Sequence, residues 1–353
     1  MHFKRFTILA LVVALSLIVA ACGGGNDEEA SGDEQNADLP MEPDISFTEI
    51  DRTGLEADTV VATYEGGEIT GDQLASYLGF HGFVNPSVQV NEAESRQELL
   101  KFLILQETVA DEVASTEWAE QKAEELWDEI NSVYTEDQTE EAYEKLHTSE
   151  EEIKDHLVGY YLMESYFREQ IDEDEALAFY EDIQEQITTA SVRHILVATE
   201  EQQPDGSMEE IRTEEEAKQL ADELYADLQE GADFAELAAE HTDDPGSKDN
   251  GGLYEDVAVG QWVPEFKQAA LEQDIDEIGE PVKTDFGYHI IRVEDRTVTP
   301  FEEIEDNVYG QLANDKIYDY YSNTLPDKIE EINIQVEEAD ADDQSEDAQS
   351  EDE

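Results

Sequence analysis

One short stretch of this chain cannot continue the long helical patterns that lie on both sides of it. In residues 94–114 the apolar side chains recur at helical spacings, at Leu99, Phe102, Leu103, Val109 and Val113. From Ala190 onward, β-branched runs such as ASVRHILVAT appear and glycines concentrate. Helical texture returns after Arg296. The alternation predicts an α+β unit inserted into a helical domain, an arrangement that chains tolerate when the termini of the inserted unit lie close together.

The inserted stretch predicts its elements in a definite order. RHILV (193–197) is a strand pattern, and residues 213–231 form an amphipathic helical pattern with a terminal glycine. Asp233 is a suitable N-cap for a short helix, and VPEFKQAALEQ (263–273) predicts another helix. Two strands around a turn follow. The order β-α-α-(β)-α-β-β predicts helices packed on an antiparallel sheet.

The N-terminus has the layout of a signal peptide. Basic residues precede an uncharged run from Phe6 to Ala21, which ends on small side chains. The run is short for a membrane span, which needs about 20 residues, so an uncleaved N-terminal anchor is the weaker alternative. Cys22 follows directly and is the only cysteine, so it cannot form an internal disulfide.

Acidic residues dominate the composition. The chain has 93 Asp and Glu against 19 Lys and Arg, a formal net charge of −74. Nucleic acid binding is therefore disfavoured, because phosphate contacts need Lys and Arg. Residues 22–50 read as a flexible acidic linker and residues 337–353 as a disordered acidic tail. Because salt shortens the range of repulsion between charges, we expect a host that lives in high salt; an ordinary acidic secreted protein is the alternative.

The residues around the single cysteine resemble a known processing signal. VAACG (19–23) is similar to the lipobox of bacterial lipoproteins, in which the cysteine is acylated and becomes the new N-terminus. The resemblance implies that Cys22 is the lipid attachment site and that the rest of the chain faces the outside of the cell membrane. Anchoring needs more than one acyl chain, since each buried methylene contributes only about 0.8 kcal/mol.

Four blocks of the inserted stretch resemble the parvulin family of peptidyl-prolyl isomerases. They are RHILV (193–197), DFAELAAEHTDDPGSKDNGG (233–252), GQWVPEFKQAAL (260–271) and EPVKTDFGYHIIRVED (280–295). With the lipobox, the linker and the helical segments, the whole plan is similar to the PrsA-type foldase lipoproteins. The resemblance implies an α+β fold: a parvulin-like domain, with helices on a small antiparallel sheet, inserted into a mainly α-helical SurA/PrsA-like chaperone domain.

The patterns and the resemblance together predict six segments. In chain order these are a signal peptide (1–21), a lipid-anchored acidic linker (22–50), an N-terminal helical foldase domain (51–187), a parvulin-type isomerase domain (188–297), a C-terminal helix that completes the foldase domain (298–336) and the acidic tail (337–353).

The parvulin resemblance also implies which residues form the site. The implied catalytic residues are His194, Asp244, Thr284 and His289, and the implied substrate-binding residues are Trp262, Phe266 and, as a weaker candidate, Phe286. Without the resemblance, both histidines would read as hydrogen-bonded core residues. Asp244 would read as a turn residue before Pro245, and the aromatic pair four residues apart would be one apolar helix face. No metal or cofactor is implied, since DDPGSKDNGG lacks the terminal Glu of an EF-hand loop.

The chain departs from the family pattern at two places. After the paired glycines the family has a glycine and an aromatic residue where this chain has Glu255 and Asp256. This departure raises the question of whether the middle strand and the pocket wall form. Phosphate-selective parvulins have basic residues after the first histidine motif, whereas VATEEQQPDG (197–206) is acidic. A preference for phosphoserine-proline is therefore not expected, because it needs cationic partners.

These features predict an extracytoplasmic foldase that is anchored through lipidated Cys22. It would isomerise X–Pro bonds, and its partners would be unfolded or newly exported proteins. One alternative is a holdase that uses the parvulin fold only for binding. A remote alternative is a solute-binding lipoprotein, which predicts two α/β lobes. The sequence leaves a homodimer open.

Overall fold

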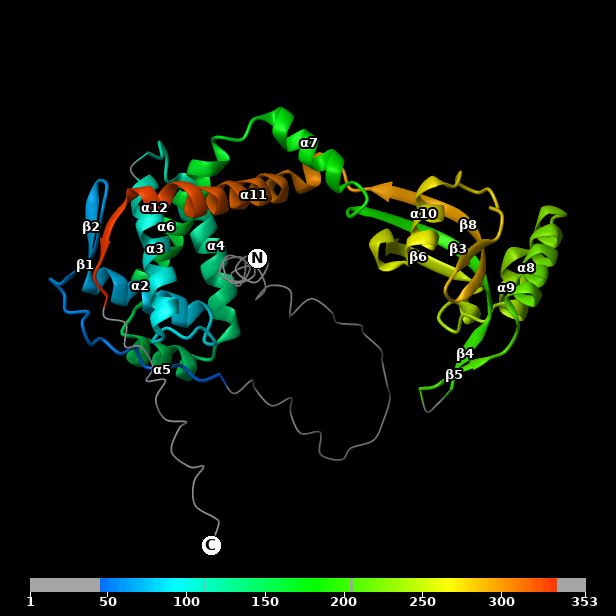
Figure 1. Cartoon of the computed structure of the whole chain (residues 1–353), viewed down its shortest axis with the longest axis horizontal. Helices are drawn as coiled ribbons and strands as arrows, with labels where there is room; N and C mark the ends of the chain where they lie inside the picture. The colour runs from blue at the N-terminus through cyan, green and yellow to red at the C-terminus, as the bar shows by residue number, and fades with distance from the viewer. Residues whose placement is uncertain (1–44, 111, 204–205, 335–353) are drawn as a thin grey trace, which may run out of the picture. The chain divides into compact units, whose positions relative to one another are not determined.

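The computed structural model describes residues 45–110, 112–203 and 206–334 (Figure 1). The predicted signal peptide, the lipid attachment at Cys22 and the acidic tail (337–353) lie outside the described residues, as does most of the linker (22–50). The chain divides into two compact units, which are described separately below. The helical unit is Met1–Asp172 with Tyr309–Glu353, and the inserted unit is Glu173–Val308.

Helices build most of the helical unit, and three of them (α2, α5 and α6) begin at side-chain caps. They are α2 (Gly71–Val84), α3 (Ala93–Ala110), α4 (Glu117–Val133), α5 (Glu136–Leu146), α6 (Glu150–Arg168) and the second half of α11 (Phe301–Asp319). Thr70 and Thr135 each make a capping box, with a glutamine at the third helical position. The apolar pattern predicted in α3 is buried from Leu99 to Leu105. The helix ends at Ala110, so Val113 lies beyond it.

A three-stranded sheet completes the helical unit. It contains β1 (Val60–Tyr64), β2 (Gly67–Thr70) and β9 (Ile329–Ile332), in the order β2-β1-β9. Both pairings are antiparallel, and Ala62 of β1 lies opposite Ile332 of β9. The C-terminal segment, expected as a helix, therefore also contains a π-helical turn at Tyr320–Thr324, the short α12 (Leu325–Lys328) and a strand.

The inserted unit is an antiparallel sheet with helices on both faces. Its elements are α7 (Glu173–Ile183), β3 (Thr188–Ala198), β4 (Glu200–Gln202), β5 (Met208–Glu210), α8 (Glu214–Gln229), α9 (Phe234–His241), β6 (Leu253–Ala258), α10 (Pro264–Glu272), β7 (Val282–Thr284) and β8 (Gly287–Val298). The main sheet has the order β6-β3-β8-β7. The predicted α+β architecture, with a small antiparallel sheet, is confirmed.

Two apolar cores lie on opposite faces of this sheet because successive strand residues point to opposite sides. On one face, Ile195, Val197 and Ile290 pack with α8 and α9. On the other face, Val192 and Ile291 pack with Phe266 and Ala270 of α10, among other residues. Figure 1 shows α8 and α9 on one side of β3 and β8. The face toward α10 holds the polar residues considered below.

The middle strand forms despite the departure from the family pattern. β6 pairs with β3 from Leu253 to Ala258, with a bulge opposite Ala190–Val192. Asp256 lies in that irregular region with a φ of 51°. This is the left-handed region, which Asp tolerates better than most residues. Its backbone N–H donates to the Ser191 hydroxyl at 3.0 Å, which satisfies the displaced donor.

A second hairpin was not expected from the sequence. β4 and β5 pair outside the main sheet, and Glu200 lies directly opposite Glu210, as Glu201 does opposite Glu209. Like charges directly opposite one another destabilise a strand pair, so this pattern does not predict a hairpin. The helix α7 belongs to the inserted unit, whereas the sequence predicted it within the helical domain. The domain boundaries stay a prediction.

Neither unit is one of the two α/β lobes that a solute-binding protein would need. The helical unit has only the antiparallel sheet β2-β1-β9 among its described residues, and the inserted unit has antiparallel sheets. In the described part of the chain, no helix has the length and apolar character needed to cross a membrane.

Candidate active site

Two neighbouring strands bring the predicted histidines together. His194 is on β3 and His289 is on β8, and the register places His289 opposite Leu196, two residues from His194. Both side chains are buried, with exposed fractions of 4% and 5%. Their Nδ1 atoms lie 3.3 Å apart, and the ring planes differ by only 15°. The rings therefore share one hydrogen bond between them.

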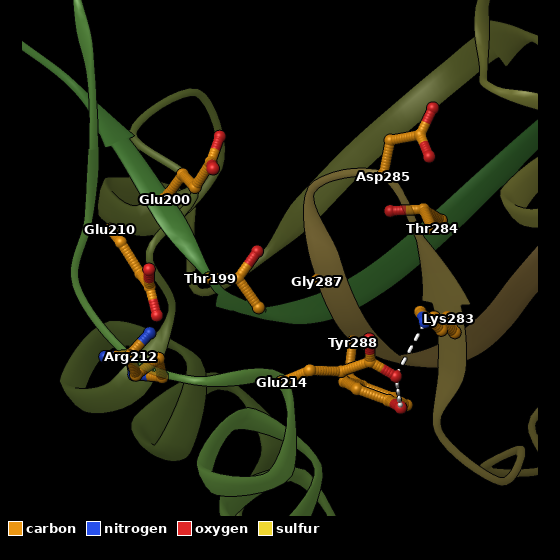
Figure 2. Close-up of a pocket in the computed structure, with 10 residues that line it drawn as sticks. All are labelled: Thr199, Glu200, Glu210, Arg212, Glu214, Lys283, Thr284, Asp285, Gly287 and Tyr288. Carbon is orange, nitrogen blue, oxygen red and sulfur yellow. Dashed lines mark hydrogen bonds and ion pairs between the residues drawn. The ribbon is translucent and has the colours of Figure 1, made fainter.

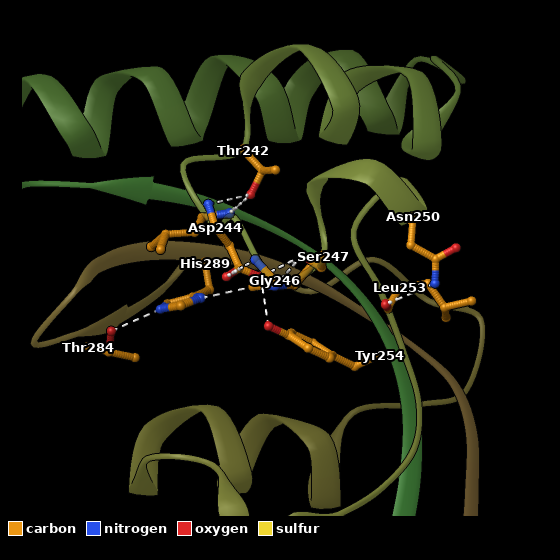
Figure 3. A network of polar contacts seen from close by, with 11 residues as sticks. Thr242, Asp244, Gly246, Ser247, Asn250, Leu253, Tyr254, Thr284 and His289 are labelled. Carbon is orange, nitrogen blue, oxygen red and sulfur yellow. Dashed lines mark hydrogen bonds and ion pairs between the residues drawn. The ribbon is translucent and has the colours of Figure 1, made fainter. Parts of the chain in front are cut away.

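The two other predicted polar residues lie at the outer ends of this pair. Asp244 Oδ2 lies 2.9 Å from His194 Nε2, and Thr284 Oγ1 lies 2.9 Å from His289 Nε2. Figure 3 shows Thr284, His289 and Asp244 in one line of contacts. The backbone N–H of Phe286 donates to Thr284 Oγ1 at 3.1 Å, which fixes the hydroxyl. Four residues from three separate segments of the sequence thus form one hydrogen-bonded chain.

Hydrogen bonds hold the loop after α9 so that Asp244 lies beside His194. The Thr242 hydroxyl accepts from the backbone N–H of Leu196 at 3.0 Å and from that of Asp244 at 3.2 Å. At the other end of the loop, the backbone N–H of His194 donates to the backbone carbonyl of Gly252 at 2.8 Å. Gly252 has a φ of 81°, and a Cβ there would lie 2.2 Å from the His194 carbonyl oxygen. Only glycine fits this approach.

Burial and hydrogen bonding set the charge states of His289 and Asp244. The pKa of His289 falls to about 3, chiefly because burial disfavours the imidazolium, and the neighbouring His194 ring adds to the effect. Burial alone would raise the pKa of Asp244. Hydrogen bonds from His194 and Ser247 outweigh burial, so the Asp244 pKa lies well below its ordinary value. His289 is therefore neutral and Asp244 ionised near neutral pH.

Phe266 of α10 and Trp262, which lies just before that helix and not on one helix face with Phe266, form an apolar wall beside the histidines. Phe266 meets both imidazoles edge-on, with centroids 5.3 Å from His194 and 5.2 Å from His289. Trp262 packs against Phe266 at 5.1 Å. Phe286 differs from these two, because its side chain is 54% exposed on the turn between β7 and β8. The structure links Phe286 to the site through its backbone N–H to Thr284.

Sequence reasoning missed two residues of this site. The Ser247 hydroxyl donates to Asp244 Oδ2 at 2.5 Å, and the Tyr254 hydroxyl donates to the same oxygen at 3.0 Å. The Tyr254 ring lies 5.4 Å from that of His194. Ser247 stands three residues after Asp244, a spacing that side chains in such turns often bridge. Tyr254 carries no comparable local signal, since its placement depends on β6 pairing with β3.

A polar pocket of about 350 Å³ lies at the foot of the β4–β5 hairpin (Figure 2). Thr284 belongs to its lining, so the pocket adjoins the hydrogen-bonded chain. Glu214 accepts from Lys283 at 2.6 Å and from the Tyr288 hydroxyl at 3.3 Å across the pocket wall. Among the described residues, no group of three or more His, Cys, Asp or Glu side chains is placed to hold a metal ion.

Comparison with known proteins gives matches for the inserted unit and for a larger part of the chain. Residues 176–297 match the family model of the PPIC-type PPIASE domain. Foldase protein PrsA of Caldanaerobacter subterraneus subsp. tengcongensis is 33% identical over 223 residues, which cover 61% of this chain and 66% of that protein. Foldase protein PrsA 4 of Bacillus cereus is 34% identical over 133 residues, covering 37% and 46%.

A solved structure shows a further likeness. The crystal structure of the peptidylprolyl isomerase PrsA from Bacillus cereus aligns with a TM-score of 0.38 and 22% identity, and covers 77% of this chain and 91% of that chain. The sequence matches span about two thirds of the first curated relative and less than half of the second. The chain is thus a homologue of the PrsA foldases that contains a PPIC-type PPIase domain.

Proposed function

We propose that the inserted unit catalyses cis–trans isomerisation of X–Pro peptide bonds. The observation that supports this most is the hydrogen-bonded chain Asp244, His194, His289 and Thr284 beside the wall of Phe266 and Trp262. The match to the PPIC-type PPIase family agrees with it. His194, Asp244, Thr284 and His289 would form the catalytic group, and Trp262 and Phe266 would hold the proline ring. Phe286 would contact the substrate from the rim.

The reaction suits such a site because no covalent bond breaks. Rotation about the amide must cross a barrier of about 18–20 kcal/mol that comes from resonance. A catalyst lowers the barrier by binding the twisted amide better than the planar one. An apolar wall holds the proline ring and excludes water, while oriented polar groups stabilise the changed charge distribution of the twisted amide. Phe266 and the histidine pair supply these two requirements on one face of the sheet.

The test measures isomerisation of a short X–Pro peptide by the full mature chain. His194→Ala and His289→Ala should each reduce kcat/KM by about tenfold or more, which corresponds to ~1.4 kcal/mol of transition-state stabilisation. His241→Ala is the matched control, because His241 lies in the same unit, is partly exposed and has only a long ion pair to Glu240 at 3.9 Å. Circular dichroism checks that each variant is folded. Rates equal to wild type in folded His194 and His289 variants would refute the assignment.

The holdase is the second candidate, and the acidic residues Glu255 and Asp256 in β6 favour it. If the folded wild-type chain shows no rate above background but suppresses aggregation of an unfolded client, the holdase replaces the isomerase. Suppression of aggregation together with isomerisation supports a foldase that does both. In that case the helical unit would bind unfolded or newly exported proteins, as the foldase names of the homologues suggest.

We further propose that the chain acts at the outer face of the cell membrane, anchored through Cys22. The support is the lipobox-like VAACG sequence and its position directly after the apolar run. Mass spectrometry of the mature N-terminus should find an acylated Cys22, and Cys22→Ala should release the protein from the membrane fraction. An unmodified cysteine on a protein that stays with the membrane would exclude this anchor.

A further inference from the structure

The hydroxyl of Tyr254 converges on the carboxylate that the histidine chain uses. Asp244 Oδ2 accepts from His194 Nε2 at 2.9 Å, from Ser247 at 2.5 Å and from Tyr254 at 3.0 Å. The loop leaves room for this contact, because a Cβ at Gly246 would lie only 2.5 Å from the Tyr254 hydroxyl oxygen. Figure 3 shows the Tyr254 hydroxyl pointing at this group. Two hydroxyl donors thus share one carboxylate oxygen with the imidazole.

The positions of the heavy atoms fit two proton arrangements. In the neutral arrangement, Thr284 donates to His289 Nε2, and His289 donates from Nδ1 to His194 Nδ1. In the charged arrangement, His194 carries one more proton and donates from Nδ1 to His289, which then donates from Nε2 to Thr284. His194 donates from Nε2 to Asp244 in both cases. An ionised carboxylate beside His194 favours the charged arrangement, since an opposite charge stabilises the protonated ring.

Hydrogen bonds from hydroxyl groups to Asp244 oppose the charged arrangement of the histidine pair. A hydrogen bond to a carboxylate stabilises the anion and makes it a weaker attractor of a further proton. We propose that Tyr254 is a positioning residue of the site. Its hydroxyl, with that of Ser247, weakens the attraction of the Asp244 carboxylate for a further proton and so keeps the histidine pair in the neutral arrangement. This inference rests on the proposed isomerase function. A neutral pair keeps charge, and the water that charge attracts, away from the proline ring against Phe266.

The surroundings of Asp244 leave few other groups that could set this balance. The titratable groups that contact it are His194 on β3 and Tyr254 on β6, and His289 on β8 lies beyond His194. In its own loop, Lys248 donates to a backbone carbonyl at 3.1 Å. α10 presents the apolar ring of Phe266. The pKa of Tyr254 is raised to about 12, first by burial and then by Asp244, so its hydroxyl stays protonated and remains a donor at neutral pH.

The test follows isomerisation by the full mature chain between about pH 5 and pH 8, where a histidine changes its charge. Removal of one hydrogen bond to a charged group is worth about one pH unit. In Tyr254→Phe we therefore expect the acid limb of the kcat/KM profile to move to higher pH by about that amount. Ser247→Ala should move the limb in the same direction, which provides a second variant if either one folds poorly.

Tyr288→Phe is the matched control. It also removes a hydroxyl that donates to a carboxylate in the same unit, that of Glu214 at 3.3 Å, but outside the histidine chain. Its acid limb should coincide with that of the wild type. An equal shift in Tyr288→Phe and Tyr254→Phe would overturn the inference.

Nitrogen-15 NMR of the His194 ring gives a readout that needs no activity. At the same pH, Tyr254→Phe should show a larger protonated fraction of His194 than the wild type, because the variant lacks one hydrogen bond to Asp244. A folded Tyr254→Phe protein with an unchanged His194 spectrum would refute the inference. An inactive wild-type protein would refute only the proposed function, because the NMR comparison would still decide the role of Tyr254.

Discussion

Two buried histidines of the helical unit should make that unit sensitive to acid. His81 has an exposed fraction of 6%, and its Nε2 is buried without a hydrogen-bond partner. It lies edge-on against Tyr77 and Phe80. Burial lowers the pKa of His81 to about 3, with a further effect of the charge of His156, and burial lowers the pKa of His156 to about 4. Both therefore stay neutral in the folded protein at pH values where an unfolded chain would protonate them.

The sign and size of the effect follow from these values. A histidine whose folded pKa is depressed contributes stability above the unfolded pKa of about 6.5, and that stability is lost as pH falls from there toward the folded pKa. One pKa unit corresponds to about 1.4 kcal/mol. At pH 5 each histidine should therefore cost the helical unit about 2 kcal/mol of unfolding free energy, or about 4 kcal/mol for the pair.

The perturbation is His81→Phe, which keeps an aromatic ring and removes the titrating nitrogens. Urea unfolding at pH 8 and at pH 5 gives the free energies by linear extrapolation. Trp118 and Trp127, which lie in the helical unit, report its unfolding by fluorescence. The loss of stability between the two pH values should be about 2 kcal/mol smaller in the variant than in the wild type.

Two comparisons isolate this effect. Repulsion among surface carboxylates also changes with pH, but it is common to both proteins and cancels in their difference. His147→Asn is the matched control, because His147 is exposed and its φ of 51° suits asparagine. This control should lose as much stability as the wild type. If His81→Phe and the wild type lose equal amounts, the argument from burial of His81 is wrong.

Three further predictions concern the inserted unit and the whole chain. Gly252→Ala should lower the unfolding free energy of the inserted unit by ~2 kcal/mol or more in urea, because the new Cβ would meet the His194 carbonyl at a positive φ. Gly260→Ala is the control and should change the unfolding free energy little, because a Cβ there has no atom within 4 Å. Thr284→Val should reduce isomerase kcat/KM by about tenfold without unfolding the unit, and an unchanged rate would separate the hydroxyl from catalysis. The Tm should rise when NaCl increases from about 0.1 M to about 1 M, because the Debye length falls from ~10 Å to ~3 Å and the net charge is −74; a flat or falling Tm in calorimetry would count against adaptation to high salt.

The sequence was most informative where short-range pattern and family resemblance agreed. The β-branched run at β3, the two strands around a turn at β7 and β8, and the order of the elements predicted the antiparallel sheet. The blocks that resemble parvulins marked residues that the structure brings within hydrogen-bond distance. His194 and His289 meet because β3 and β8 pair in a fixed register. The roles of these residues in catalysis stay a proposal. The side chain of Phe286 lies exposed on a turn, and its contact with the substrate stays a proposal.

What the sequence did not predict depends on contacts between distant segments. β9 is a strand because it pairs with β1, near the other end of the described chain. Its own residues, IEEI, have no strong strand pattern. The β4–β5 hairpin pairs glutamates with glutamates, against the usual cross-strand preference. Tyr254 reaches Asp244 because β6 pairs with β3, with Tyr254 opposite Val192, and no local rule places that pairing.

The pairing of β1 with β9 has a consequence for the order in which the protein can form. Synthesis proceeds from the N-terminus, so residues 60–64 are made early and their partner strand, residues 329–332, is made last of the described strands. The inserted unit, which lies between them in sequence, has all its strands available before β9 appears. Until then one edge of β1 has unpaired backbone groups, which can pair with another strand. The sheet of the helical unit is therefore complete only when the C-terminal strand is present, and a chain cut short before Ile329 would leave that edge of β1 open to a neighbour.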